Sequence, residues 1–348
     1  MGLFVNNKNK LDSAPLIFVW IGNSLPSWCK RALILNSNLN DRDVILIGSS
    51  VLKSCIPEDI KFFELESFYD SSIAKIKINT LNSDKRRSGF WQKTYERFFV
   101  LNTFMKKYDI KYFFHAELDN ICMIPEGLEF KIDQFGLGCY VPQDSESRAI
   151  ASLIYINNIY GLEFMCNIAD DILVQYSNEM ELLAYCLNKS DHFYPLPTES
   201  HLNGLYFSKN ADLDTTVKSL GGIFDAASFG QYILGIDARN STKLLVKNKF
   251  ENELSCNNWE ETYFSVDDLG KSVSVRIADK NYKLMNLHIH SKIFPDILSL
   301  IYLNDIFINL NNNKSNIVQI NIKGFVRGNL SKYLIIIRNV LLRFGVVI

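Results

Sequence analysis

No apolar stretch in this sequence reaches the roughly 18 uninterrupted residues that a membrane-spanning helix needs. The most apolar segment, Tyr333–Ile348, is interrupted by Arg338 and Arg343. The N-terminal residues also lack the long apolar core of an export signal. Because 47% of the 348 residues are hydrophobic, the chain can still bury a large core. We therefore expect a globular, cytoplasmic protein.

Neither charge sign is in excess, because 37 Lys and Arg residues face 38 Asp and Glu residues for a formal net charge of −1. Binding to a nucleic-acid backbone requires a basic field, so we expect no nucleic-acid partner. The seven cysteines contain no Cys-x-x-Cys pair, and their odd number argues against a closed set of disulfides. Reduced thiols are typical of the cytosol, in agreement with the expected location.

Short apolar runs closed by a glycine recur near the start of the chain, at Leu16–Ile21 and Val44–Ile47. Such runs are typical of parallel strands buried on both faces, and the segment between them can hold a crossover helix. From Ser88 to Tyr108, bulky side chains recur at helical spacing, and the apolar run Lys111–Phe114 follows. The sequence therefore predicts an α/β fold with a mixed, mostly parallel central sheet flanked by helices.

Two carboxylates follow the run Lys111–Phe114, within the segment His115–Asn120. Open α/β sheets bind their ligands beyond the carboxyl ends of the strands, which is where Glu117 and Asp119 stand. Hard oxygen ligands of this kind select Mg²⁺ or Mn²⁺, and such a metal could hold a diphosphate. The alternative interpretation is a solvated acidic turn. We predict that Asp119 binds the metal and that Glu117 contributes to diphosphate binding.

A second polar motif occurs far along the chain, at Leu287–Lys292. On a strand, His288 and His290 point to the same side, and either imidazole could complete the coordination of the metal. Lys292 could hold a phosphate as a point charge. Together with His115, three of the five histidines fall in the two candidate motifs. The alternative is a pair of half-exposed strand histidines beside a surface lysine.

A glycine-rich segment, Gly221–Tyr232, carries polar side chains suited to recognising sugar hydroxyls. We predict that Asp225 acts as a base on the acceptor side and that Gln231 and Asp237 contact the acceptor. The other interpretation of this segment is an ordinary loop.

Further candidates for donor binding stand near the first strand and before the long helix. Trp20 ends the first apolar run and could stack on a base or sugar, with Gly22 close by. Arg87 could meet phosphates. The competing interpretations are a core tryptophan and a solvated helix start.

Three segments together resemble a GT-A glycosyltransferase of bacterial surface-polysaccharide synthesis. They are Phe18–Gly22 with Leu25 and Pro26, the acidic run His115–Asn120, and His288–Lys292. The resemblance spans roughly residues 15 to 295, and its basis is the shared order of sheet, acidic motif and late histidine. It implies a nucleotide-sugar donor, a glycan or lipid-linked glycan acceptor, and work at the inner face of the bacterial membrane.

Such enzymes typically carry an Asp-x-Asp signature, whereas this chain has Glu117 at the first acidic position. The metal role therefore falls on Asp119. The opening Trp-Ile-Gly resembles that of configuration-retaining mannosyl- and galactosyltransferases, but the Gly-Gly-x-Tyr-x-Asp lead into the acidic motif is missing. Retention and inversion both stay open.

The Asn-rich segment 309–316 predicts a linker, because it is polar and has no periodicity. It would separate a catalytic domain, residues 1–308, from a basic and apolar tail, residues 317–348. The tail is expected to form either a packed terminal helix or a peripheral contact with the membrane. Two alternatives to sugar transfer fit the same motifs: nucleotidyl or phosphosugar transfer, and a non-catalytic scaffold of the polysaccharide machinery.

Overall fold

The computed structural model describes residues 13–69, 90–172, 178–202, 213–227, 229–230, 263–267, 269–277, 280–290, 292 and 294. Several predictions of the sequence lie outside these residues: the donor contact of Arg87, the acceptor contacts of Gln231 and Asp237, the linker 309–316 and the tail 317–348. No described helix has both the length and the apolar character needed to cross a membrane.

A mixed central sheet has the strand order β3-β2-β1-β4-β8-β6-β7, with β9 also paired to β6. Strands β3, β2, β1 and β4 are mutually parallel, β8 runs antiparallel between β4 and β6, and β9 is parallel to β6. The prediction of a mostly parallel sheet is therefore confirmed. The strands are β1 Leu16–Trp20, β2 Val44–Gly48, β3 Lys61–Glu64, β4 Phe113–Ala116, β6 Cys139–Ser145, β7 Arg148–Ala149, β8 Leu153–Ile156 and β9 Phe193–Leu196.

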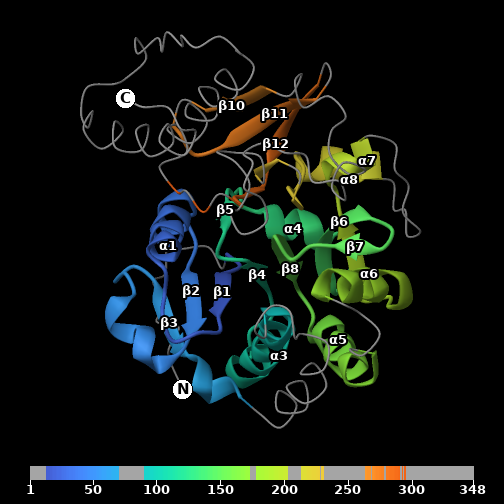
Figure 1. Ribbon diagram of the computed structural model, residues 1–348. Coiled ribbons are helices and arrows are strands. Elements are labelled where there is room, and N and C mark those ends of the chain that lie inside the picture. The colour runs from blue at the N-terminus through green and yellow to red at the C-terminus, as the bar shows by residue number, and fades with distance from the viewer. Residues whose placement is uncertain are drawn as a thin grey trace, which may run out of the picture.

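Helices cover both faces of this sheet, as predicted (Figure 1). Ile17 of β1 packs on the face covered by α3, α5 and α6, whereas Leu16 and Phe18 pack on the face covered by α1 and α4. This alternation explains why the strand is an unbroken apolar run. The helices and 3-10 turns are α1 Ser27–Leu39, η1 Ser50–Cys55, η2 Leu65–Phe68, α3 Phe90–Tyr108, α4 Leu128–Asp133, α5 Ile159–Ile172, α6 Glu179–Lys189, α7 Glu199–Leu202 and α8 Leu213–Leu220.

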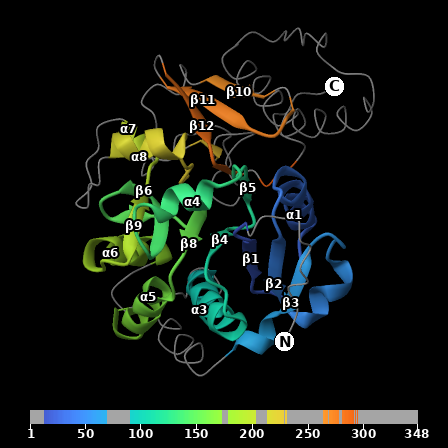
Figure 2. The ribbon, with the colours of Figure 1, turned by 180° about the vertical axis from the view of Figure 1, so that it is seen from behind.

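Two smaller sheets lie beyond the carboxyl end of β4, and Figure 2 shows the three-stranded one from behind. Strands β10 Tyr263–Val266, β11 Val273–Ile277 and β12 Lys280–Leu284 form one antiparallel sheet. The other joins β13, Asn286–His288, to β5, Asn120–Cys122, with His288 opposite Asn120. This pairing brings the second polar motif of the sequence next to the acidic run.

The other edge of β5 is closed by side chains of α1 and of the residue that caps it, instead of by a strand. Asn36 donates from Nδ2 to the carbonyl of Asn120 (2.9 Å) and accepts from the backbone N–H of Cys122 (2.7 Å). Asn40, one turn later, donates to the carbonyl of Cys122 (2.8 Å) and accepts from the N–H of Ile124 (3.0 Å). The two amides thus satisfy buried backbone groups as a neighbouring strand would, and they hold β5 in place.

His115 belongs to the acidic run in sequence but lies in the core, with no exposed surface. Its Nδ1 lies 2.9 Å from the carbonyl oxygen of Ile17, which can only accept, so Nδ1 carries the proton. Burial, assisted by the charge of Arg97, lowers the pKa of His115 to about 3. A neutral core histidine therefore accounts for one of the three histidines that the motifs contain.

The low pKa of His115 predicts that the protein loses stability in acid. Unfolding restores a pKa near 6.5, so between about pH 6.5 and 3 the unfolded chain binds more protons. The free energy of unfolding should therefore decrease as the pH is lowered through this range. His115 contributes about 1.4 kcal/mol of this decrease per pH unit. We expect His115→Asn, whose amide can still donate to Ile17, to lack this contribution. Urea unfolding of both proteins at pH 7, 6 and 5 measures the slopes, and equal slopes would contradict the assignment.

Candidate metal-binding site

The acidic turn between β4 and β5 is tight and well anchored. The backbone N–H of Asn120 donates to the carbonyl of Glu117 (3.0 Å), and the carbonyl of Asp119 accepts from the N–H of Ile289 (2.7 Å). The second bond ties the turn to the residue that follows β13. Both carboxylates are therefore held beside the end of β13, where His288 stands.

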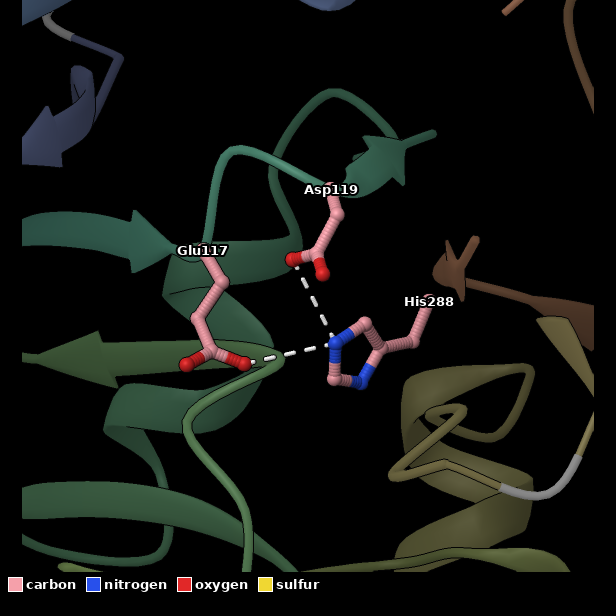
Figure 3. A group of neighbouring side chains, drawn as sticks. All are labelled: Glu117, Asp119 and His288. Atoms are coloured by element: carbon pink, nitrogen blue, oxygen red, sulfur yellow. Dashed lines mark ion pairs between the residues drawn. The ribbon is translucent and has the colours of Figure 1, made fainter. Parts of the chain in front are cut away.

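Glu117, Asp119 and His288 form a compact group with carboxylate and imidazole ligands (Figure 3). Nε2 of His288 lies 3.3 Å from Oε2 of Glu117 and 3.3 Å from Oδ1 of Asp119. The three ligand atoms all lie within 4.8 Å of one another. Two carboxylate oxygens and one imidazole nitrogen suit Mn²⁺ or Mg²⁺, so the donor set fits the metal that the sequence predicts.

The imidazole of His288 is oriented by its other nitrogen. Nδ1 lies 2.9 Å from the carbonyl oxygen of Ala226 and must carry a proton to bond there, which directs Nε2 at the carboxylates. Although burial alone lowers the pKa of His288, Asp119 and Glu117 outweigh it and raise the pKa to about 9. In the metal-free protein His288 is therefore a cation at neutral pH, and a metal must displace the Nε2 proton.

Asp225 lies behind His288, with no exposed surface. Its carboxylate accepts from the backbone N–H groups of Phe229 (2.9 Å), Gly230 (2.7 Å) and His288 (2.9 Å). Burial raises its pKa, against the lowering effect of these bonds. In this arrangement Asp225 fixes the backbone of His288, while its predicted role as an acceptor-side base stays a prediction. A Cβ at Gly230 would lie 2.4 Å from the nitrogen of His288, so this close approach requires glycine.

Asn286 ties the same segments together from β13. Its Nδ2 donates to Oδ1 of Asn120 (2.9 Å) and to the carbonyl of Asp225 (2.9 Å), and its Oδ1 accepts from the N–H of Asp225 (3.1 Å). A side chain with both donors and acceptors is needed for this three-way contact, which explains a fully buried asparagine.

Lys292 and His290 complete the surroundings of the site. The ammonium of Lys292 forms an ion pair with Oδ2 of Asp119 and lies 5.3 Å from the centre of the Trp28 ring. Burial raises the pKa of Asp119, but Lys292 and His288 prevail and hold that pKa well below its ordinary value. The ring of His290 packs against that of His288 with centroids 4.6 Å apart. Lys292 thus stands beside the acidic pair, and its contact with a diphosphate and a metal bond from His290 stay predictions.

Trp20 belongs to an aromatic group beside Lys292. Its indole Nε1 donates to the carbonyl of Ser24 (2.9 Å), and its ring meets that of Trp28 edge-on at 6.3 Å. Trp28 in turn stacks on Phe294 at 5.9 Å. A Cβ at Gly22 would lie 3.1 Å from Trp20 Nε1, so the glycine leaves room for the indole. Their donor-binding roles stay predictions.

Arg97 contacts the site and Glu179 contacts Arg97, although sequence reasoning assigned neither residue a role. Arg97 donates from Nη1 to Oε1 of Glu117 (2.7 Å) and from Nη2 to Oε1 of Glu179 (3.4 Å). Burial raises the pKa of Glu179 to about 7, and Arg97 opposes the rise. The signal was present in the sequence, because Arg97 stands four residues before Leu101 on the apolar face of α3, where a charge requires a partner.

No protein-family model matches this chain, and no curated protein matches it. Among solved structures it is similar to mouse xyloside xylosyltransferase 1, with a TM-score of 0.38 and 7% identity over 53% of this chain and 85% of that chain. An active-site mutant of LgtC gives a TM-score of 0.37 and 10% identity, covering 59% and 83%. A cytidylyltransferase from Leptospira borgpetersenii gives 0.31 and 14%, covering 53% and 76%. Similarities this distant do not assign an activity.

Proposed function

We propose that this chain is a metal-dependent glycosyltransferase that moves a sugar from a nucleotide-sugar donor to a glycan or lipid-linked glycan acceptor in bacterial surface-polysaccharide synthesis. The observation that carries the proposal is the meeting of Glu117, Asp119 and His288 beyond the carboxyl end of β4, with Lys292 beside them. That is the edge at which open α/β sheets bind nucleotides.

The charges of the site suit a diphosphate. Two carboxylates balance a divalent cation, which leaves the ammonium of Lys292 to meet a phosphate oxygen. Oε2 of Glu117, Oδ1 of Asp119 and Nε2 of His288 would hold Mn²⁺ or Mg²⁺, which supplies Lewis-acid stabilisation of the departing nucleoside diphosphate. Asp225 and the Ala226 carbonyl hold His288 in the geometry that this requires. Trp20, Gly22 and Arg87 remain proposed contacts to the donor, and Gln231 and Asp237 to the acceptor.

The cellular setting is part of the proposal. A lipid-linked acceptor would place the reaction at the cytoplasmic face of the inner membrane, and the basic tail 317–348 would suit a peripheral contact there. Hexosyl and pentosyl donors are both consistent with the site.

A panel of nucleotide sugars tests the function directly. The purified full chain is incubated with each donor in Mn²⁺, in Mg²⁺ and in a chelator, and the released nucleotide is identified. We expect one donor or a few to release nucleoside diphosphate only when metal is present. In a parallel incubation with nucleoside triphosphates and sugar 1-phosphates, release of pyrophosphate would replace the proposal with nucleotidyl transfer. Calorimetry that detects no metal-dependent binding of nucleoside diphosphates would favour the scaffold.

A further inference from the structure

A line of alternating charges leads from the metal site into the interior between α3 and α6. It begins at Glu117, continues through Arg97 and ends at Glu179. The side chains of Arg97 and Glu179 are 8% and 5% exposed, whereas that of Glu117 is 21% exposed. Buried charges of this kind are costly unless each one is paired. We therefore expect the Glu117–Arg97–Glu179 contacts to have a role at the metal site.

Arg97 determines which oxygen of Glu117 faces the site. Oε1 accepts from Arg97 at 2.7 Å, whereas Oε2 lies 3.3 Å from Nε2 of His288. Because a charge-assisted hydrogen bond holds Oε1 toward Arg97, Oε2 is the oxygen that would face a metal at the site. Glutamate has one more rotatable bond than aspartate. A partner that fixes the carboxylate compensates for that freedom.

Glu179 holds the guanidinium from the opposite side. Its Oε1 accepts from Arg97 at 3.4 Å, and its Oε2 accepts from the hydroxyl of Thr94 at 2.8 Å. Thr94 and Arg97 lie one turn apart on α3, so both can contact Glu179, the first residue of α6. The positive end of the α6 dipole also favours a carboxylate there. Arg97 is thus fixed between two carboxylates and cannot turn away from Glu117.

We propose that Arg97 is a positioning residue of the metal site, which presents Oε2 of Glu117 to the metal, and that Glu179 holds Arg97 in place. The inference rests on the proposed metal site and is independent of which sugar is transferred. It assigns to α3 and α6 a part in a site whose ligands come from the β4–β5 turn and β13.

A double-mutant cycle on metal affinity tests this role. Mn²⁺ is titrated calorimetrically into the donor-free full chain of the wild type, Arg97→Gln, Glu117→Gln and the double variant. Loss of an outer partner typically weakens metal binding about 10- to 100-fold, and we expect Arg97→Gln to fall in this range. With Glu117 already replaced, Arg97→Gln should weaken binding less than about twofold, because the two residues act as one unit. Arg97→Lys, which keeps the charge, should recover part of the affinity.

Two further variants separate positioning from a loss of structure. Arg97→Gln leaves Glu179 buried without its cation, so Arg97→Gln with Glu179→Gln removes both charges, and thermal melting reports the fold. Arg31→Gln, at an exposed position of α1, should bind Mn²⁺ like the wild type. Equal weakening by Arg97→Gln in both Glu117 backgrounds, or unchanged affinity in a folded Arg97 variant, would overturn the inference. If the wild type did not bind Mn²⁺, both this inference and the proposed function would be overturned.

Discussion

Asp119→Asn should weaken Mn²⁺ binding at least about 100-fold and abolish metal-dependent release of nucleoside diphosphate. Loss of an outer partner of a metal ligand already costs about 10- to 100-fold, and Asp119 is proposed as a direct anionic ligand. The amide has the shape of the carboxylate and can still accept from Lys292, so the turn should stay folded. The carbonyl of Asp119, which accepts from Ile289, is unchanged by the substitution.

The matched control for this variant is Asp109→Asn. Asp109 has a side chain 83% exposed and a left-handed φ of 51°, a conformation that asparagine tolerates well. We expect it to bind Mn²⁺ and to melt like the wild type. A folded Asp119→Asn protein that still released nucleoside diphosphate in a metal-dependent way would remove Asp119 from the site.

Lys292→Met should have opposite effects on the two ligands of the site. In the metal-free protein the ammonium of Lys292 neutralises Asp119, so an incoming cation must compete with it. Hydrogen bonds to charged groups contribute about 1.5–3 kcal/mol, and the partial exposure of this pair places it at the lower end. We therefore expect Mn²⁺ alone to bind about tenfold more tightly and a nucleoside diphosphate about tenfold more weakly.

Calorimetric titration of each ligand alone, and of each in the presence of the other, measures both effects. In the wild type the diphosphate should strengthen Mn²⁺ binding, because it draws Lys292 from Asp119; this coupling should shrink in Lys292→Met. Lys53→Met, at an exposed ion pair with Glu64, serves as the control. If Lys292→Met weakened the binding of both ligands alike, Lys292 would not occupy the place of the cation.

The strands and the long helix could be predicted because their patterns are local. The apolar run before Gly48 is buried throughout and the run before Gly22 is buried at residues 16–18, and the helix expected to end at Tyr108 does so. Part of the site could also be predicted from the sequence, since the acidic run and the late histidine each follow an apolar element. The acidic run follows a strand of the parallel part of the sheet, where ligand sites are expected, but His288 and Lys292 reach it through the antiparallel pairing of β13 with β5.

The remaining features depend on contacts between distant segments. His115 stands two residues before Glu117, yet it lies inside a strand that is buried on both faces. Its side chain therefore enters the core whichever face it points to. The bonds of Asp225 to the backbone depend on the path of residues 229–230 behind β13. The role of Arg97 could not be predicted, because its partner Glu179 belongs to α6 and no pattern within α3 reveals where α6 lies. Periodicity indicates which face of an element is buried, but not which partner covers it.

The pairing of β5 with β13 has a consequence for the synthesis of this protein. Asn120 and Asn286, joined by a side-chain hydrogen bond, stand 166 residues apart in the chain. A nascent chain can complete β1, β2 and β4 and close one edge of β5 with Asn36 and Asn40, while His288 is still untranslated. Metal uptake at the proposed site would therefore follow the synthesis of almost all of the described residues. Retained metal would then report a polypeptide whose two distant segments have already met.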